Sequence, residues 1–273
     1  MAESKIKEEF EKLRQMYNED PRQQSFNALV LGEMGSGKSF LERTARMPVH
    51  IDSFDPGGTK CLQKNDGQEL LDGIFADTRF ESEDRLHPTM YQIWKTEFMR
   101  RKTSGYFDGI GTYCLDSSTR WAESIMNRIL QKAGVITGAS DAIGDGIPRF
   151  TKDYTPQKIE IQNMINLILD LPCDCIITGH LEQTKDEGTG RVTYRYMTTG
   201  KGALIIPTLF DEVWVMDPKE TSSGVAYRIL TKNTGTYAAR SRLAKGGLLE
   251  TYEKPNIKEI LAKAGMLRAD KPY

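Results

Sequence analysis

The chain has 273 residues, and its 37 basic and 38 acidic side chains nearly cancel, leaving a formal net charge of −1. This balance excludes a protein that coats nucleic acid by positive charge alone, although it allows a local basic patch. Hydrophobic residues make up 38% and charged residues 27%, as in an ordinary folded domain. The start is polar and no apolar run is long enough to cross a membrane, so we expect a cytoplasmic protein without membrane contact.

The first 20 residues are predicted to form an amphipathic helix. Its apolar stripe, at helical spacing among many charges, consists of Ile6, Phe10, Leu13 and Tyr17. We assign residues 1–24 to this N-terminal helix and residues 25–273 to one larger domain. The stripe needs a partner, and we expect it to pack on its own domain rather than on a neighbouring subunit.

Further along the chain, apolar runs alternate with helical patterns. Predicted strands cover residues 28–31, 49–52, 110–116, 175–178, 212–216 and 225–230. Predicted helices cover residues 38–47, 83–102, 157–171 and 256–264 and the stretch around 122–129, with a polar loop over 134–155 and a hairpin over 182–202. This alternation predicts an α/β fold with a mostly parallel central sheet flanked by helices. The last strands follow one another without helices, which predicts an antiparallel C-terminal edge.

A glycine-rich turn between the first strand and the next helix carries the clearest motif. Residues 32–39 read G-E-M-G-S-G-K-S and fit G-x-x-x-x-G-K-[ST] at every fixed position, which identifies a P-loop. Its glycines would let backbone N–H groups surround phosphate oxygens, Lys38 would reach the β- and γ-phosphates of ATP, and Ser39 would ligate Mg²⁺. The candidate nucleotide-binding residues are Gly32, Glu33, Met34, Gly35, Ser36, Gly37, Lys38, Ser39 and Phe40.

A second magnesium anchor is expected where another strand ends in a carboxylate. The run Tyr113-Cys114-Leu115-Asp116 delivers such a group at the edge of the sheet where α/β proteins bind ligands. Asp116 is therefore our candidate, together with Ser39, for the metal site. The alternative for Asp116 is a role in capping the following helix. Asp174 and Asp211 are weaker candidates, because neither ends a clear apolar strand.

The residue that activates water is not evident beside Asp116. Many ring ATPases place a glutamate directly after this aspartate, but the residue here is Ser117. In RecA-like proteins the carboxylate comes instead from the end of the strand after the P-loop helix. Asp52 and Asp55 lie there, and either could act as a general base. Asp55-Pro56-Gly57 is equally typical of an ordinary turn.

The predicted strand 175–178 runs into polar residues at the same edge. His180 and Gln183 follow it and could sense the γ-phosphate by hydrogen bonding. The alternative is a loop histidine without a functional role.

Taken in order, these motifs resemble a known family. The ordered set is the P-loop, Ile51-Asp52, Leu115-Asp116-Ser117-Ser118, Ile177-Thr178-Gly179-His180, Thr199-Gly200-Lys201-Gly202 and Leu209-Phe210-Asp211-Glu212-Val213. It is similar to the phage-encoded, short RecA-like P-loop ATPases of single-strand annealing and recombination. The resemblance implies a RecA-like core that binds ATP and Mg²⁺, binds single-stranded DNA and promotes annealing, often with a single-strand-binding protein. A phage-encoded member would act in the host cytoplasm.

Two basic segments bear on DNA binding and on assembly. Residues 185–201 combine Lys185, Arg191, Arg195 and Lys201 with Tyr194 and Tyr196, and cations with interleaved aromatics can bind single strands. Residues 225–249 contain Arg228, Lys232, Arg240, Arg242 and Lys245 without an acid.

The second segment suggests an assembly in which subunits share a nucleotide site. In a ring or filament of identical subunits, Lys232 or Arg242 could reach a neighbour's γ-phosphate. The alternatives are an ordinary exposed hairpin for residues 185–201 and an edge protected from aggregation for residues 225–249.

Two other functions remain open at this point. A P-loop kinase that phosphorylates a small molecule would use residues 185–201 as a basic lid. A non-catalytic, nucleotide-gated DNA-binding module would account for the uncertain water-activating carboxylate.

Overall fold

The chain folds around one large β-sheet. The computed structural model describes residues 2–20, 23, 25–138, 145–243 and 247–273. The sheet order is β13-β11-β8-β1-β5-β4-β2-β3, with β12 also paired to β8. The strands are β1 Asn27–Gly32, β2 Val49–Ser53, β3 Ile74–Asp77, β4 Thr112–Asp116, β5 Asp174–Gly179, β8 Glu212–Met216, β11 Ile229–Leu230, β12 Arg240–Ser241 and β13 Tyr252–Glu253.

The direction of the strands matches the expectation from the sequence. From β8 through β1, β5, β4 and β2 to β3, all neighbours are parallel. Beyond β8, the short strands β11, β12 and β13 pair antiparallel. The predicted α/β class, with a mostly parallel sheet and an antiparallel C-terminal edge, is confirmed.

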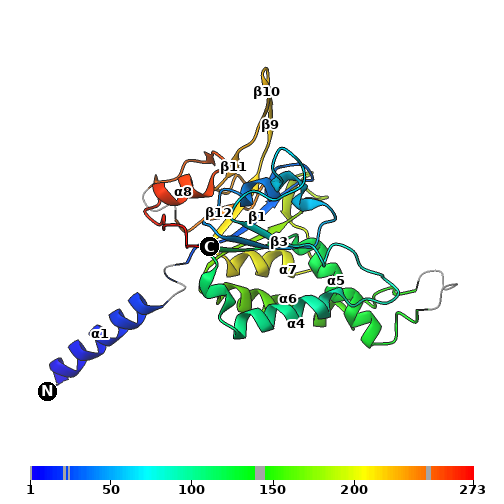
Figure 1. Cartoon of the computed structure of the whole chain (residues 1–273), viewed down its shortest axis with the longest axis horizontal. Helices are drawn as coiled ribbons and strands as arrows, with labels where there is room; N and C mark the ends of the chain where they lie inside the picture. Colours follow the sequence, from blue (N-terminus) through cyan, green and yellow to red (C-terminus); the bar gives the residue numbers. More distant parts are fainter. Residues whose placement is uncertain (1, 21–22, 24, 139–144, 244–246) are drawn as a thin grey trace.

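Helices cover both faces of this sheet (Figure 1). One face carries α3 Lys38–Glu42 and α8 Ile257–Lys263, and the other carries α4 Met90–Thr103, α5 Ser118–Lys132 and α6 Tyr154–Leu169. Shorter helical turns are η1 Gly58–Leu62, η2 Tyr106–Gly109, α7 Gly202–Ile205 and η3 Ile206–Leu209. Because strand side chains alternate, Leu29 and Leu31 join the core beneath α4–α6, while Ala28 and Val30 join the core beneath α3 and α8. This burial on both sides explains why the central strands read as continuous apolar runs.

The carboxyl ends of the central strands meet at one edge. Leu31 of β1 lies opposite Gly179 of β5, and Ser53 of β2 lies opposite Asp116 of β4. Gly32, the last residue of β1, lies opposite Met216 of β8. The strand register therefore brings the polar residues that follow each strand together at this edge of the sheet.

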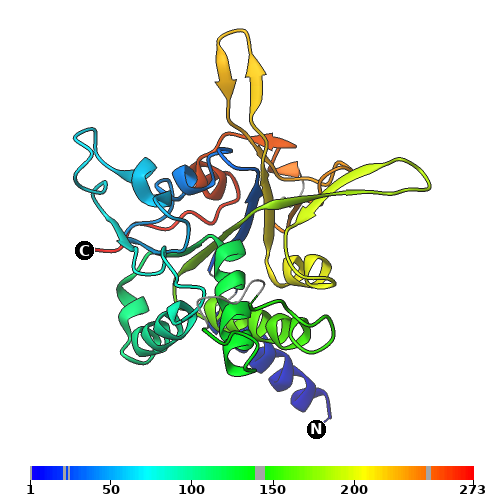
Figure 2. The same ribbon diagram turned by 90° about the vertical axis from the view of Figure 1, so that its right-hand side faces the viewer.

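Two hairpins extend from the body as separate arms (Figure 2). The first consists of β6 Leu181–Lys185 and β7 Val192–Tyr196, within the predicted polar hairpin. The second consists of β9 Lys219–Thr221 and β10 Gly224–Ala226. The single strand predicted over 225–230 is thus divided, because residues 224–226 are exposed in the arm whereas Ile229 and Leu230 are buried in the sheet.

Two predicted helices are shorter than expected. The helix after the P-loop ends at Glu42, where the chain tightens into turns and Thr44 Oγ1 donates a hydrogen bond back to Leu41 O. The helix predicted from residue 83 begins at Met90, because Pro88 disfavours helical backbone in the residue before it. In the predicted loop over 134–155, residues 139–144 lie outside the described part of the chain.

The N-terminal helix, α1 Ala2–Glu19, lies away from the sheet (Figure 1). Every side chain described from residue 5 to residue 19 is exposed. The expectation that α1 packs on its own domain is therefore wrong, because other elements already cover both faces of the sheet. Among the helices described, none has the length and apolar character that a membrane span requires.

Candidate active site

The P-loop connects the end of β1 to the start of α3. Gly35 and Gly37 adopt φ values of 74° and 92°, in the left-handed region that glycine tolerates best. A Cβ on Gly32 would lie 2.4 Å from Ser36 Oγ, so the loop closes tightly on the end of β1. Ser36 Oγ is buried and makes no hydrogen bond within the described residues. This tight loop, with a spare buried hydroxyl, fits the cradle expected for phosphate groups.

Lys38 lies inside this loop rather than in solvent. Its Nζ donates hydrogen bonds to Gly32 O at 3.1 Å and to Glu33 O at 2.9 Å. Burial lowers the pKa of Lys38, while the carboxylates of Asp116 and Asp55 oppose this shift. Two carbonyl groups of the P-loop thus hold the Lys38 ammonium group beside the expected phosphate site.

Asp116, at the end of β4, faces the start of α3. Ser39 Oγ donates to Asp116 Oδ2 at 2.6 Å, and Thr178 Oγ1 donates to Asp116 Oδ1. Burial raises the pKa of Asp116, and the hydrogen bonds from Ser39 and Thr178 oppose this rise. A hydroxyl and a carboxylate in direct contact form an oxygen donor set that suits Mg²⁺. The structure therefore brings the two predicted metal ligands together, and adds Thr178 as the residue that orients Asp116.

Asp55 is a further carboxylate near this pair. A Cβ on Gly58 would lie 3.4 Å from Asp55 Cβ and 3.5 Å from Asp116 Oδ2, so both aspartates flank the start of η1. Ser117 Oγ donates to Asp55 Oδ1 at 3.1 Å. Asp55 also lines the cavity around the P-loop, which makes it the carboxylate best placed to act on water there.

Asp52 requires a correction. Its side chain is on the opposite face of β2, fully buried beneath α4. Asp52 Oδ2 accepts hydrogen bonds from Tyr113 at 2.7 Å and Trp94 at 2.9 Å, and Oδ1 contacts Arg101 and His50. Because these donors occupy the carboxylate and exclude water, the structure does not support Asp52 as a general base.

His180 and Gln183, the two candidates for sensing the γ-phosphate, lie in different places. His180 is half-buried and lines the cavity at the P-loop. Burial lowers the pKa of His180, and the positive charge of Lys38 adds to this effect. Its backbone N–H and its Nδ1 both lie 3.2 Å from Thr119 Oγ1 on α5. Gln183, by contrast, is exposed on β6 and outside this cavity.

A cavity of about 510 Å³ surrounds these groups. Its apolar walls include Phe40, from the predicted set, and three residues that sequence analysis missed: Met216, Tyr227 and Pro255. The ring of Tyr227 approaches the loop closely, since a Cβ on Gly37 would lie 3.2 Å from its Cδ1. Met216 ends β8 beside Gly32, whereas Tyr227 and Pro255 come from the antiparallel edge, and no local spacing in the sequence connects the three to the P-loop.

The two weaker aspartate candidates lie elsewhere. Asp174 begins β5, accepts a hydrogen bond from Phe26 N at 3.0 Å and forms an ion pair with Arg268. Asp211 precedes β8, where it binds Asn27 and Arg242. Both are thus at the amino ends of the strands, at the edge of the sheet opposite the P-loop.

The basic residues of the C-terminal edge face away from this chain's own cavity. Lys232 is exposed beyond β11, and Arg242 Nη1 donates to Asp211 Oδ1 at 2.6 Å. Neither residue lines the P-loop cavity of its own chain. Lys245 lies outside the described residues.

The aromatic residues of the β6–β7 hairpin are already occupied, which corrects the expectation that they stack on bases. Tyr196 is buried, and its hydroxyl donates to Ser118 Oγ at 2.8 Å. Tyr194 stacks on Tyr237 with ring centroids 5.0 Å apart. Arg191 binds Gly235 O at 2.7 Å. The contacts of Tyr194 and Arg191 hold the hairpin against the segment before β12, and the contact of Tyr196 holds it against α5.

Comparisons with solved structures show remote likenesses. Similar chains include a KaiC-like protein from Pyrococcus horikoshii, with 14% identity and a TM-score of 0.39 over 75% of this chain and 78% of that one. A type III secretion ATPase from pathogenic bacteria has 13% identity and a TM-score of 0.41, over 88% of this chain and 61% of that one. The flagellar accessory protein FlaH from Methanocaldococcus jannaschii has 11% identity and a TM-score of 0.39, over 83% of each chain.

A comparison with models of protein families identifies the family of this chain. No curated protein matches the chain significantly. The family described as the AAA domain, however, matches residues 25–243, from just before β1 to just after β12. This match covers most of the chain and includes the P-loop, Asp55, Asp116 and His180. The chain therefore belongs to the AAA domain family of P-loop ATPases.

Proposed function

We propose that this ATPase hydrolyses ATP with Mg²⁺, binds single-stranded DNA and promotes the annealing of complementary strands. One contact supports a connection between the nucleotide-binding site and the proposed DNA-binding site. Thr119 on α5 contacts His180 of the P-loop cavity and also lines a second, larger cavity. One hydrogen-bonded pair of residues, His180 in the first cavity and Thr119 in the second, thus connects the two cavities.

On the nucleotide side, each residue has a defined task. The N–H groups of the P-loop and Lys38 would bind the phosphates, and Ser39 and Asp116 would hold the metal. Bound Mg²⁺ would neutralise charge on the phosphate oxygens. Asp55 would accept a proton from the attacking water, and neutral His180 would report on the state of the γ-phosphate.

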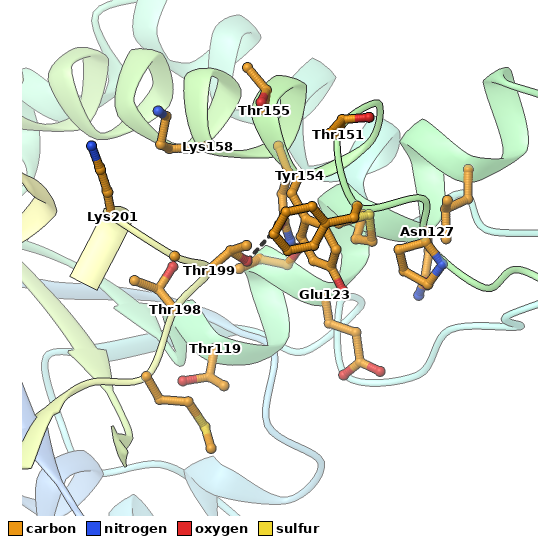
Figure 3. Close-up of a pocket in the computed structure, with 18 of the residues that line it drawn as sticks. Thr119, Glu123, Asn127, Thr151, Tyr154, Thr155, Lys158, Thr198, Thr199 and Lys201 are labelled. Atoms are coloured by element: carbon orange, nitrogen blue, oxygen red, sulfur yellow. Dashed lines mark hydrogen bonds between the residues drawn. The ribbon is translucent and has the colours of Figure 1, made fainter. Parts of the chain in front are cut away.

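On the DNA side, the second cavity has about 950 Å³ and lies between α5, α6 and the turn before α7 (Figure 3). Lys158, Lys201 and Arg85 line it, against the carboxylates Glu123 and Glu182. In Figure 3 the side chains of Lys158 and Lys201 point away from Glu123, which leaves one end of the cavity basic. A basic end of this kind suits the phosphates of a single strand.

Aromatic side chains for stacking on bases line the same cavity. Phe150 is 86% exposed and packs edge-on against Tyr154, and both residues line the cavity. They would take the role that the sequence suggested for Tyr194 and Tyr196.

The same proposal includes an assembly of identical subunits, as a ring or filament. In such an assembly Lys232 or Arg242 would reach the nucleotide of a neighbouring subunit, because both are outside their own P-loop cavity. A single-strand-binding protein would deliver the DNA.

The central test is ATP hydrolysis with and without single-stranded DNA. We expect magnesium-dependent hydrolysis that DNA stimulates, and a loss of about a hundredfold or more in Lys38→Ala. Lys201→Glu should abolish the stimulation and weaken DNA retention, while the basal rate persists. Lys219→Glu makes the same charge change on the exposed strand β9 and serves as the matched control.

The outcomes separate the proposal from its alternatives. Hydrolysis that ignores DNA, without DNA retention at low salt, would overturn the DNA-binding function. Retention of DNA that responds to ATP without hydrolysis would indicate a nucleotide-gated module instead. Annealing of complementary oligonucleotides, compared between wild type and Lys201→Glu, tests the remaining step.

A second candidate function is phosphoryl transfer to a small molecule. The observation in its favour is the same 950 Å³ cavity, which has the size of a small-molecule site. In that case ATP would be consumed without release of inorganic phosphate once the acceptor is supplied. Measuring ADP and inorganic phosphate together distinguishes the two functions, because an ATPase releases them in equal amounts.

A further inference from the structure

The exposed apolar stripe of α1 has no partner within the described chain. Ile6, Phe10, Leu13 and Tyr17 are 53%, 61%, 53% and 63% exposed. A helix in water gains little from such a stripe unless another surface covers it. The stripe therefore indicates an interaction surface.

The spacing of the stripe identifies the kind of surface. Its residues are separated by four, three and four positions, which is the repeat of a coiled-coil seam. In heptad notation, Ile6 and Leu13 take the d positions, and Phe10 and Tyr17 take the a positions. Three neighbours of the seam are charged, with Lys7 and Arg14 at e and Glu9 at g, and the other g residue is the apolar Met16.

We propose that α1 pairs in parallel with α1 of a second copy of this chain. In a parallel pair, a g residue faces the e residue that lies five positions later in the partner. Glu9 of one helix then faces Arg14 of the other, and symmetry provides this attraction twice. An antiparallel pair would instead place Lys7 against Arg14, with like charges together. The charges of α1 thus favour a second copy of α1 as the partner, in the parallel orientation.

Arg14 can reach a partner helix without giving up its contact within α1. Arg14 Nη1 donates to Glu11 Oε1 at 2.8 Å within the helix, and the guanidinium group has five N–H donors in all. Arg14 can therefore bind a second carboxylate without losing the first. Its side chain is 68% exposed, so the second carboxylate can approach from solvent.

The pairing has a consequence for the assembly. An 18-residue helix extends about 27 Å, enough for roughly two heptads of seam. So short a coil gives reversible association rather than an obligate dimer. Because the helices are parallel, both ATPase bodies lie at the same end of the coil. The pairing of α1 does not depend on DNA binding.

The test is the solution mass of the full chain by light scattering or sedimentation, from about 1 to 100 μM. Without nucleotide and DNA, so that the nucleotide-bridged assembly does not contribute, we expect concentration-dependent dimers in the wild type and monomers in Phe10→Asp. Glu9→Arg and Arg14→Glu should each weaken association about tenfold, because each turns two attractions into repulsions. The double variant Glu9→Arg/Arg14→Glu should restore it.

A matched control and three contrary outcomes complete the experiment. Glu8→Arg makes the same charge change at the outer f position and should leave the mass unchanged. Circular dichroism checks that each variant keeps its helix. A monomeric wild type at every concentration overturns the proposal, as does a dimer that Phe10→Asp does not disturb. Stronger association in Arg14→Glu would show an antiparallel pair and also overturn it.

Discussion

Two groups of polar side chains lie on opposite sides of the sheet, one at the P-loop and the other beneath α4. At the P-loop, Lys38 is held by loop carbonyls, Ser36 Oγ has no described partner, and Asp55 faces an open cavity. Beneath α4, Asp52 and Arg101 belong to a cluster in which the charges are paired. A buried charged side chain thus indicates a functional site only where some of its hydrogen-bond or ion-pair partners are missing and a cavity lies beside it.

The paired cluster is built like a structural core. Arg101 donates to Asp52 Oδ1 at 3.0 Å and to Asp77 Oδ2 at 2.6 Å. Burial alone would raise the pKa of Asp77, but hydrogen bonds from Arg79 and Arg101 outweigh it and hold the pKa far below its usual range. The cluster therefore connects β2, β3 and α4 by ion pairs that water scarcely reaches.

The largest effect on stability is expected from breaking that cluster. Arg101→Ala leaves Asp52 as a buried carboxylate without its cation, which should cost about 3–5 kcal/mol of unfolding free energy. Urea denaturation measures it. The adjacent Arg100→Ala is the control, because Arg100 is exposed and its pair with Glu97 should contribute less than about 1 kcal/mol. Equal losses in both variants would show that the cluster is no more than a surface contact.

The next largest effect concerns catalysis at the other group. Asp55→Asn should lower the rate of ATP hydrolysis by about a hundredfold, because the amide cannot accept a proton from water. The melting temperature should stay near that of the wild type, since Asp55 is partly exposed. Asp66→Asn, on an exposed turn, serves as the control. An unchanged rate would show that Asp55 is not the residue that activates water.

A smaller effect is expected at the apolar wall of the P-loop cavity. Tyr227→Ala removes a ring that packs beside Gly37, and it should raise KM for ATP by about three- to tenfold with little change in kcat. Steady-state kinetics measure both constants. Val225→Ala, on the exposed arm just before Tyr227, should change neither constant. A fall in kcat alone would contradict a binding role.

These two groups also show what the sequence could and could not predict. The P-loop and Asp116 are local patterns with a strand before them, so their positions follow from spacing and the parallel register. Asp52 and Asp55 are only three residues apart, yet they face different environments. Strand alternation turns Asp52 toward α4, whereas Asp55 follows the strand and is free to face the cavity.

Residues supplied by distant segments could not be predicted in this way. Tyr227 and Pro255 reach the P-loop from the antiparallel edge, and Thr119 reaches His180 from α5. The contacts of Tyr194 and Tyr196 likewise depended on long-range packing. The helical spacing of apolar residues correctly predicted α1 as an amphipathic helix. It did not predict the surface that α1 contacts, because an apolar stripe shows that a partner is needed but not which partner.

Glu42 differs from both groups, because it is fully buried near Asp116 yet has no hydrogen-bond partner for either oxygen among the described residues. Burial, with the Asp116 carboxylate adding to it, raises the pKa of Glu42 well above the ordinary 4.5. The folded state therefore keeps a proton that the unfolded state releases above that value, and wild-type stability falls as pH rises from there toward the folded pKa. A glutamine side chain cannot titrate, so Glu42→Gln should gain about 1 kcal/mol relative to wild type between about pH 5 and pH 8. Urea denaturation at both values measures this change, with exposed Glu187→Gln as control, and an identical difference at the two pH values would contradict it.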